Sequence, residues 1–339
     1  MDIGRYIARR LLLAIFVLLG VLVITFIISH SFGNPIYAWL GKSAALHPNL
    51  VLLYEKQYHL TDPLYIQFYY YVVGLSQGNL GFSPSRGFEP VSQVIEQTLP
   101  YTLQIAFFAI ILTLLMGVVF GILSSFYHKT PVDAGVRGFY LAGYSSPPFF
   151  IGLLLLIAFV YFFHWLPSGG AASITITPPH TITGIPMLDS LVEGNFTYLA
   201  SALDHVILPS LTLALCTFGV VTRILRSSVL DVMHSNFIRT ARAKGADERT
   251  VFLNHGLRNA LIPVVTVSSL VVTYLLTGTV FVENIFAYPG MGQYVVAALL
   301  AQDYPGILAT TLIFALLIVI TNLVADLLYV VVDPQIRYS

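Results

Sequence analysis

The side chains best placed to engage another molecule gather in one polar stretch, residues 231–263, between two hydrophobic segments. One set within it follows the spacing i, i+3, i+4, i+7 and would share a helix face: Ile238, Ala241, Arg242 and Gly245. Ala241 and Gly245 keep that face thin enough for close approach, and Arg239, Lys244 and Arg249 surround it with positive charge. A short basic helix of this kind suits docking into a groove on a partner protein.

The flanking residues predict how this face is held. Ser235 or Asn236 can cap the start of a first helix, and Gly245 can end it in the left-handed conformation. Asp247 is then placed to cap a second helix that runs toward the following hydrophobic segment. The sequence therefore predicts a helix, a glycine break and a second helix.

This stretch resembles the cytoplasmic EAA loop of ABC importer permeases, which contains the coupling helix that sits in the ATPase subunit. The general pattern is Glu-Ala-Ala, three residues, Gly, nine residues, an apolar residue, any residue and Leu-Pro. Aligned on Gly245, this chain has Arg239, Thr240 and Ala241 for the triplet and His255-Gly256-Leu257-Arg258 for the tail. It departs at the Glu, the middle Ala, the apolar position and the Pro.

The departures resemble the dipeptide/oligopeptide/nickel branch of that family, which typically reads RTARAKG and then HxLRNALIP. The resemblance continues in VENIFAYPGMG (282–292), AQDYPGI (301–307), NLVADLLYVVVDPQIR (322–337) and RYIARRLLLAIFVLLGV (5–21). It therefore covers almost the whole chain through several motifs in the right order.

The resemblance implies a B-type membrane permease subunit with the type I ABC importer permease fold. Its partners would be a second related permease, two cytoplasmic ABC ATPase subunits, an extracellular substrate-binding protein and the lipid bilayer, with no nucleic acid. ATP and Mg would be bound by the ATPase subunits, and this chain would hold no cofactor or metal. The ATPase contact is predicted at Ile238, Arg239, Thr240, Ala241, Arg242, Lys244, Gly245, Asp247 and Glu248.

The composition independently indicates an integral membrane protein. Hydrophobic residues make up 57% and charged residues 9% of the chain, against about 25% charged in a typical soluble domain. We expect an all-α protein with six transmembrane helices, because six segments are long enough to cross about 30 Å of hydrocarbon. They are Leu11–Ser29, Leu103–Phe126, Phe139–Phe163, Val206–Thr222, Ala260–Val282 and Gly306–Val332.

The distribution of Lys and Arg predicts the orientation. These residues precede the first span and lie between the second and third and between the fourth and fifth, whereas segments 165–205 and 283–305 contain none. Both termini and the polar stretch would then lie in the cytoplasm, and the N-in/C-in protein would sit in the plasma membrane of a bacterium or archaeon.

Three regions follow along the chain. Residues 1–30 form the N-terminal cytoplasmic segment and first span, and residues 31–100 form a long extracytoplasmic loop. Residues 101–339 form a permease core of five spans with the coupling loop at about 225–260. In the outer loop, Tyr65, Phe68, Tyr69 and Val72 have an amphipathic helical spacing. They fit either a small cap or an interfacial element.

Several catalytic patterns fail in this chain. Gly41-Lys42-Ser43 ends like a phosphate-binding loop, but Ile36 stands where its first glycine is required. Pro147 replaces the last glycine of GxSxG, and no HExxH occurs. The sequence therefore predicts no catalytic residue, and any energy from ATP would come through another subunit.

Two features inside the spans allow more than one interpretation. Asp326 lies in the sixth span, where an ionisable residue suggests function; it could pair with Arg223 or Arg226, or take part in gating or proton coupling. Thr266, Ser269 and Thr273 follow i, i+3, i+7 in the fifth span and could line a wet pathway, or their hydroxyls could bond their own helix backbone.

These observations predict the permease subunit of an ATP-driven importer of short peptides. Oligosaccharides or nickel chelates are alternative substrates of the same importer type. A proton-coupled secondary transporter using Asp326 is the more distant alternative, although it would call for inverted repeats and further intramembrane acids.

Overall fold

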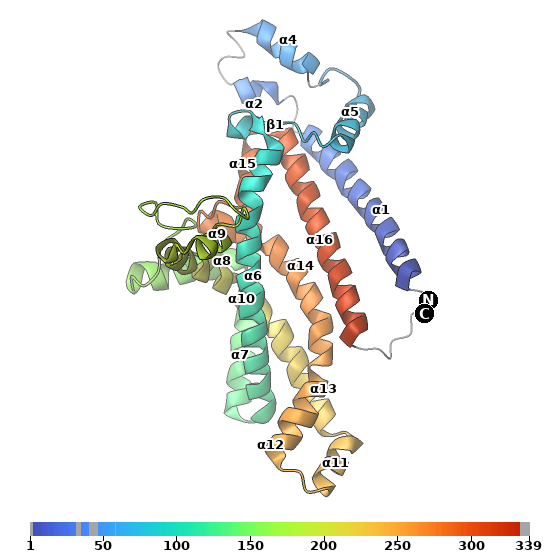
Figure 1. The fold of residues 1–339 in the computed structure, drawn as a ribbon, viewed down its shortest axis with the longest axis vertical. Coiled ribbons are helices and arrows are strands. Elements are labelled where there is room, and N and C mark those ends of the chain that lie inside the picture. Colours follow the sequence, from blue (N-terminus) through green and yellow to red (C-terminus); the bar gives the residue numbers. More distant parts are fainter. Residues whose placement is uncertain (1–2, 32–34, 41–46, 58, 333–339) are drawn as a thin grey trace.

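The computed structural model describes residues 3–31, 35–40, 47–57 and 59–332. Side chains are described over the same ranges except at residues 3–9, 11, 37, 38, 269 and 325–332. The described chain is mainly helical, with an irregular segment at residues 163–185 and a two-stranded hairpin at one end (Figure 1).

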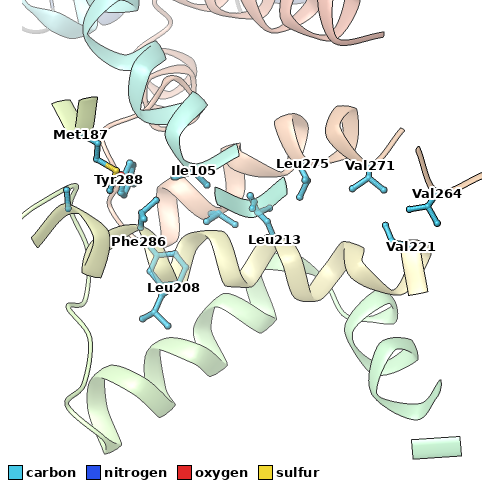
Figure 2. Packing of buried hydrophobic residues seen from close by; sticks show 14 of the residues in the cluster. Ile105, Met187, Leu208, Leu213, Val221, Val264, Val271, Leu275, Phe286 and Tyr288 are labelled. Atoms are coloured by element: carbon cyan, nitrogen blue, oxygen red, sulfur yellow. The ribbon is translucent and has the colours of Figure 1, made fainter. Parts of the chain in front are cut away.

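Three long helices form the centre of the molecule: α6 (Val91–Phe126), α10 (Phe196–Met233) and α14 (Ile262–Ile285). Ile105 of α6, Leu213 of α10 and Leu275 of α14 are fully buried in their shared core (Figure 2). Helix α10 is the most enclosed of the four single apolar helices, because 72% of its most apolar stretch is buried. It spans 38 residues, or about 57 Å at roughly 1.5 Å per residue, so it extends well beyond the predicted Val206–Thr222.

Small residues let α6 and α10 approach closely. A Cβ at Gly117 would lie 2.5 Å from Val221, and one at Gly121 would lie 2.9 Å from Leu225. The hydroxyls of Thr113 and Thr217 bond across the same interface at 2.8 Å. Small residues and hydroxyl pairs are the usual means by which helices associate in a lipid environment, where the hydrophobic effect between them is weak.

Helix α1 (Ile3–His30) packs against α16 (Tyr304–Val332) beside this core, and α16 in turn packs against α14. The two run antiparallel, so the start of α1 and the end of α16 lie at the same end of the pair (Figure 1). Most of the described side chains of α1 between residues 12 and 28 are exposed and apolar. That surface is the one expected of a helix in contact with lipid.

The third predicted span, Phe139–Phe163, is not one continuous helix. Helix α7 (Pro131–Ser145) ends before Pro147, and α8 (Pro148–Leu155) continues as the π-helix η2 (Leu156–Phe162) at 110° to α7. Ser146 and Pro147 are extended, with ψ near 138° and 142°. The cause is the pair of prolines, because a residue before proline is driven out of the helical region and proline donates no N–H.

By length and composition, four described helices could each cross a membrane, and the number becomes six if each of two bent pairs forms one span. The single helices contain Leu12–His30, Val91–Phe126, Phe196–Met233 and Tyr304–Val324, and the bent pairs are Pro131–Ser145 with Pro148–Phe162 and Glu248–Ser268 with Leu270–Ile285. The predicted all-helical membrane protein is confirmed, and the first, second, fourth and sixth predicted spans fall inside these single helices.

Short elements cover one end of the molecule. The predicted amphipathic helix in the long loop is confirmed as α5, and it lies close to the final turns of α1 (Figure 1). The elements of the loop are α2 (Ile36–Leu40), α4 (Pro48–Gln57), α5 (Leu64–Ser76), β1 (Phe82–Ser83), η1 (Pro84–Arg86) and β2 (Glu89–Pro90). Two further helices, α9 (Pro186–Glu193) and α15 (Met291–Leu300), lie before α10 and α16.

Candidate docking site

The polar stretch folds into a helical hairpin at the opposite end of the molecule from α5, built from α11 (Asn236–Ala243) and α12 (Glu248–Thr250) (Figure 1). Gly245 has φ +81°, its N–H bonds Arg242 O at 2.9 Å, and Ala246 N–H bonds Ala241 O at 3.2 Å. This pair of bonds is the Schellman motif. The prediction that Gly245 ends the first helix in the left-handed conformation is therefore confirmed.

The two acidic residues predicted for the contact also stabilise the hairpin itself. Asp247 caps α12 by accepting a hydrogen bond of 3.2 Å from Thr250 N–H, which lowers the pKa of its carboxyl. Glu248 accepts two hydrogen bonds from the Arg242 guanidinium, Nε–Oε1 at 2.7 Å and Nη2–Oε2 at 3.0 Å. The predicted Asp247 cap is confirmed, and Arg242–Glu248 closes the turn between the helices.

The N-terminal cap of α11 differs from the prediction. Ser235 occupies the cap position with an extended backbone, but its side chain makes no capping hydrogen bond. Its hydroxyl donates instead to Val232 O at 2.6 Å, at the end of α10. The hydroxyl therefore joins the two helices rather than satisfying a free N–H of α11.

The face of α11 predicted for docking is partly turned toward the rest of the protein. Ile238 is fully buried and Ala241 half-buried, whereas Arg239, Thr240 and Lys244 are exposed. Ile238 therefore anchors the helix to its own chain. Because a helix has 3.6 residues per turn, anchoring at Ile238 directs the neighbouring positions outward.

Sequence reasoning missed Phe237, the large apolar side chain of this exposed surface. It is 45% exposed, and it lies three residues before Thr240 and seven before Lys244, so all three share one side of α11. An exposed aromatic residue beside basic ones is typical of the anchors that dominate protein interfaces. The sequence signal was that Phe237 directly precedes Ile238, because two adjacent apolar residues on a short helix cannot both point toward the core.

The segment that follows the hairpin packs onto the ends of α6 and α10 and leads into α14. A Cβ at Gly256 would lie 2.8 Å from the sulfur of Met233 in α10, and Phe252 contacts Phe126 of α6 edge-on, with ring centroids 5.8 Å apart. Both residues belong to the π-helix η3 (Val251–Leu257), which continues through α13 (Arg258–Ala260) into α14. Displacement of the hairpin would therefore act on α6, α10 and α14 together.

A buried ion pair lies near the same ends of α6, α7 and α10. Asp133 is 1% exposed and accepts hydrogen bonds from Arg226, Nε–Oδ1 at 2.9 Å and Nη2–Oδ2 at 2.8 Å. Arg226, one of the residues predicted to pair with Asp326, is therefore bound to Asp133. Asp326 itself lies in α16, but its side chain falls outside the described residues, as does that of Ser269.

Two of the predicted pathway residues of the fifth span, Thr266 and Thr273, are half-buried and hydrogen-bonded. The Thr273 hydroxyl bonds Asn322 Oδ1 of α16 at 3.0 Å, and the Thr266 hydroxyl lies 3.5 Å from Ile262 O of its own helix. The exposed stripe of α14 lies on another side. It consists of Leu270, Tyr274, Thr277, Phe281 and Asn284, spaced three or four residues apart.

At the α5 end, two buried carboxylates organise the start of α15 and α16. Glu283 accepts hydrogen bonds from the backbone N–H groups of Gly292 at 2.6 Å and Gln293 at 3.0 Å, and from the Thr102 hydroxyl at 2.7 Å. Asp303 accepts from Gly306 N–H at 2.8 Å and from the Ser83 and Ser85 hydroxyls. The motifs VENIFAYPGMG and AQDYPGI thus encode carboxylate caps at helix N-termini.

Known proteins resemble this chain over nearly its whole length. It is 41% identical to the probable D,D-dipeptide transport system permease protein of Escherichia coli K12, over 95% of this chain and 94% of the relative. It is 35% identical to the oligopeptide transport system permease protein of Bacillus subtilis 168, over 99% of this chain and 100% of the relative.

A dipeptide transport system permease protein of Haemophilus influenzae is also 35% identical, over 98% of this chain and 99% of the relative. Residues 117–338 match a family model described as the inner membrane component of binding-protein-dependent transport systems. That match includes the hairpin, which carries the candidate docking surface, and α10 and α14, which connect the hairpin to the core. The chain therefore belongs to the family of binding-protein-dependent transport system inner membrane components.

Proposed function

We propose that this chain is the permease subunit of an ATP-driven importer of short peptides and forms half of the translocation pathway. Relatives of nearly equal length are named as permease proteins of dipeptide, D,D-dipeptide and oligopeptide transport systems. The partners would be a related permease, two cytoplasmic ABC ATPase subunits that bind ATP and Mg, and an extracellular substrate-binding protein. The complex would reside in the plasma membrane with α11 on the cytoplasmic side.

The observation that carries this proposal is the construction of the α11 hairpin. Its outer surface exposes Phe237, Arg239 and Lys244, while Ile238 fixes it to the protein. The hairpin is joined through η3 to the ends of α6 and α10 and to α14. It can therefore receive a push from a soluble subunit and deliver it to the helices that surround the pathway.

The proposed cycle follows from that linkage. ATP binding would draw the two ATPase subunits together and move both coupling hairpins, which would rock the spans from inward-open to outward-open. Peptide released by the binding protein would then enter, and hydrolysis with product release would restore the inward-open state. A rigid hairpin suits this role because packed helices switch between discrete arrangements rather than deforming continuously.

The exposed stripe of α14 is the proposed wall of the pathway. It includes Thr277 and Asn284, whereas the exposed surface of α1 is almost entirely apolar. Thr277 and Asn284 also donate to their own helix backbone, at 2.9 Å to Tyr274 O and 2.7 Å to Val280 O. The stripe fits a face turned toward the sister permease because it mixes these polar side chains with aromatic ones. Tyr274 and Phe281 would supply apolar surface for varied peptide side chains.

Replacement of Phe237 by Ala tests the docking surface. We expect Phe237→Ala to leave the subunit in the membrane at normal abundance but to reduce co-purification of the ATPase subunits and peptide-stimulated ATP hydrolysis. Phe196→Ala is the matched control, because Phe196 is 67% exposed near the start of α10 and far from α11. Equal behaviour of the two variants would refute the assignment of the docking surface.

A further inference from the structure

A polar cavity of about 880 Å³ lies beside the first turns of α6, at the end of the molecule opposite the hairpin (Figure 1). One part of its wall comes from the start of α6, and the rest comes from Arg86 of η1, segment 181–186 and Pro289. Pro289 follows Asn284, the last residue of the exposed stripe of α14, by five positions. The cavity is therefore close to the end of the proposed pathway wall, and its volume is within the range of about 300–1,000 Å³ that small-molecule sites occupy.

The start of α6 turns a polar face toward this cavity. The lining residues Gln93, Glu96, Gln97 and Pro100 are spaced three or four positions apart and so share one side of the helix. The side chains of Gln93, Glu96 and Gln97 are exposed, and none of them makes a hydrogen bond or ion pair within the described part of the chain. Their polar groups are therefore accessible to a ligand.

Two side chains of opposite charge line the cavity. Arg86 is the only cationic residue and Glu96 the only acidic one among the described residues of its wall. Both are exposed, and neither has an ion-pair partner in the described ranges. The Arg86 guanidinium lies 5.8 Å from the centroid of the Tyr294 ring, which attracts the cation without neutralising it. The cavity therefore offers one free charge of each sign.

A short peptide with free termini matches this wall. Its ammonium group can pair with Glu96, its carboxylate can accept two N–H bonds from Arg86, and glutamine amides can both donate to and accept from its peptide groups. A neutral oligosaccharide would leave both charges unpaired, and a simple anion or cation would face one like charge. The core of a protein interface is depleted of charged residues, so the free charges also argue against a docked protein. Charge complementarity therefore favours a zwitterionic peptide.

We propose that this cavity is an entry site for the transported peptide, in which Arg86 binds the carboxylate and Glu96 binds the ammonium group. Gln93 and Gln97 would bind the amide groups between them. The inference rests on the proposed function and extends it, because it gives this subunit its own selection for free peptide termini.

Peptide binding to the assembled complex of permease and ATPase subunits, with the binding protein left out, tests the proposal. Saturation-transfer NMR detects weak ligands, and the probes are trialanine, N-acetyl-trialanine and trialanine amide. We expect trialanine to bind about 5-fold more tightly than either blocked form, because each blocked form loses one exposed ion pair. Equal binding of the three peptides, or no binding of trialanine, would overturn the proposal.

Two variants assign the peptide termini to their partners. In Glu96→Gln, trialanine should bind no better than N-acetyl-trialanine, while the preference for trialanine over its amide remains; Arg86→Gln should show the reverse. Glu89→Gln and Lys56→Gln are matched controls, because both residues are exposed in the same 31–100 segment but do not line the cavity. If Glu96→Gln and Arg86→Gln keep both preferences, the cavity is not the site.

ATP hydrolysis with the binding protein present separates failure of this inference from failure of the proposed function. No stimulation by any peptide would contradict the proposed function. Stimulation by peptides that show no preference for free termini in the binding experiment would contradict the entry site alone. If Arg86→Gln and Glu96→Gln lose co-purification of the binding protein but bind trialanine normally, the cavity is a docking surface for that protein and the entry site is refuted.

Discussion

Gly245 shows how one residue holds the coupling hairpin in shape. Its φ of +81° is in the left-handed region, where a side chain costs roughly 1–2 kcal/mol. A Cβ there would meet no atom of this chain within 4 Å, so the space around it is open. A larger residue is therefore tolerated by the subunit itself but would meet a partner docked on α11.

We predict that Gly245→Leu leaves the subunit in the membrane but uncouples ATP hydrolysis from transport, measured in proteoliposomes. Gly194→Leu is the matched control, since Gly194 also ends a short helix, has φ +76°, and would have no atom within 4 Å of an added Cβ. Normal transport by Gly245→Leu, or equal loss in both variants, would contradict docking at this turn.

The Arg242–Glu248 pair makes a second prediction at the residue scale. Both side chains are exposed, so solvent screens the pair and its removal will hardly change overall stability. We expect Arg242→Glu to lower coupled transport by opening the turn. The charge-reversed double variant, Arg242→Glu with Glu248→Arg, should recover part of the activity, and no recovery would assign Arg242 to the partner rather than to the turn.

At the scale of elements, the buried Asp133–Arg226 pair connects α7 to α10. It lies outside any repeating pattern, because the two residues are 93 positions apart. Removing one partner of a buried pair costs about 3–5 kcal/mol when the other charge is left unpaired. Here Arg137 Nε, 3.6 Å from Asp133 Oδ1, would remain beside the carboxylate and reduce that cost. We predict that Arg226→Ala lowers the unfolding temperature in detergent markedly, and that Arg223→Ala, the exposed neighbour on α10, does not.

The contact between α6 and α10 gives a further prediction. Gly117→Ala would place a methyl group 2.5 Å from Val221, and overpacking of this kind costs about 1–3 kcal/mol. Adding Val221→Ala should restore part of the lost thermal stability, whereas Gly135→Ala, in open space on α7, should change it little. Equal stability of Gly117→Ala and the unmodified protein would refute the close contact.

Element-scale features also show what the sequence could predict. Long apolar runs located the spans, and the capping signals Gly245 and Asp247 located the hairpin, because these signals act between near neighbours. The direction of the break at Pro147 and the burial of Ile238 depend on contacts with distant segments. The open side of α14 depends on such contacts too, since hydroxyls occur on more than one side of that helix and packing against α16 decides which side is covered.

At the scale of the whole molecule, the hairpin and the α5 region lie at opposite ends, joined by α6, α10 and α14 (Figure 1). This arrangement places the surface proposed for the ATPase at the end of the molecule opposite the predicted extracytoplasmic segment 31–100 (Figure 1). A conformational change at one end must reach the other through the closely packed central helices. We therefore predict that ATP hydrolysis and substrate delivery depend on each other.

The most direct test is ATP hydrolysis by the complete complex, co-purified in mild detergent and reconstituted in proteoliposomes, with binding protein and libraries of peptides, oligosaccharides and nickel chelates. We predict recovery of a sister permease and two ATPase subunits, with hydrolysis stimulated by short peptides only. A chain that purifies alone and moves solute along a proton gradient without ATP would contradict it.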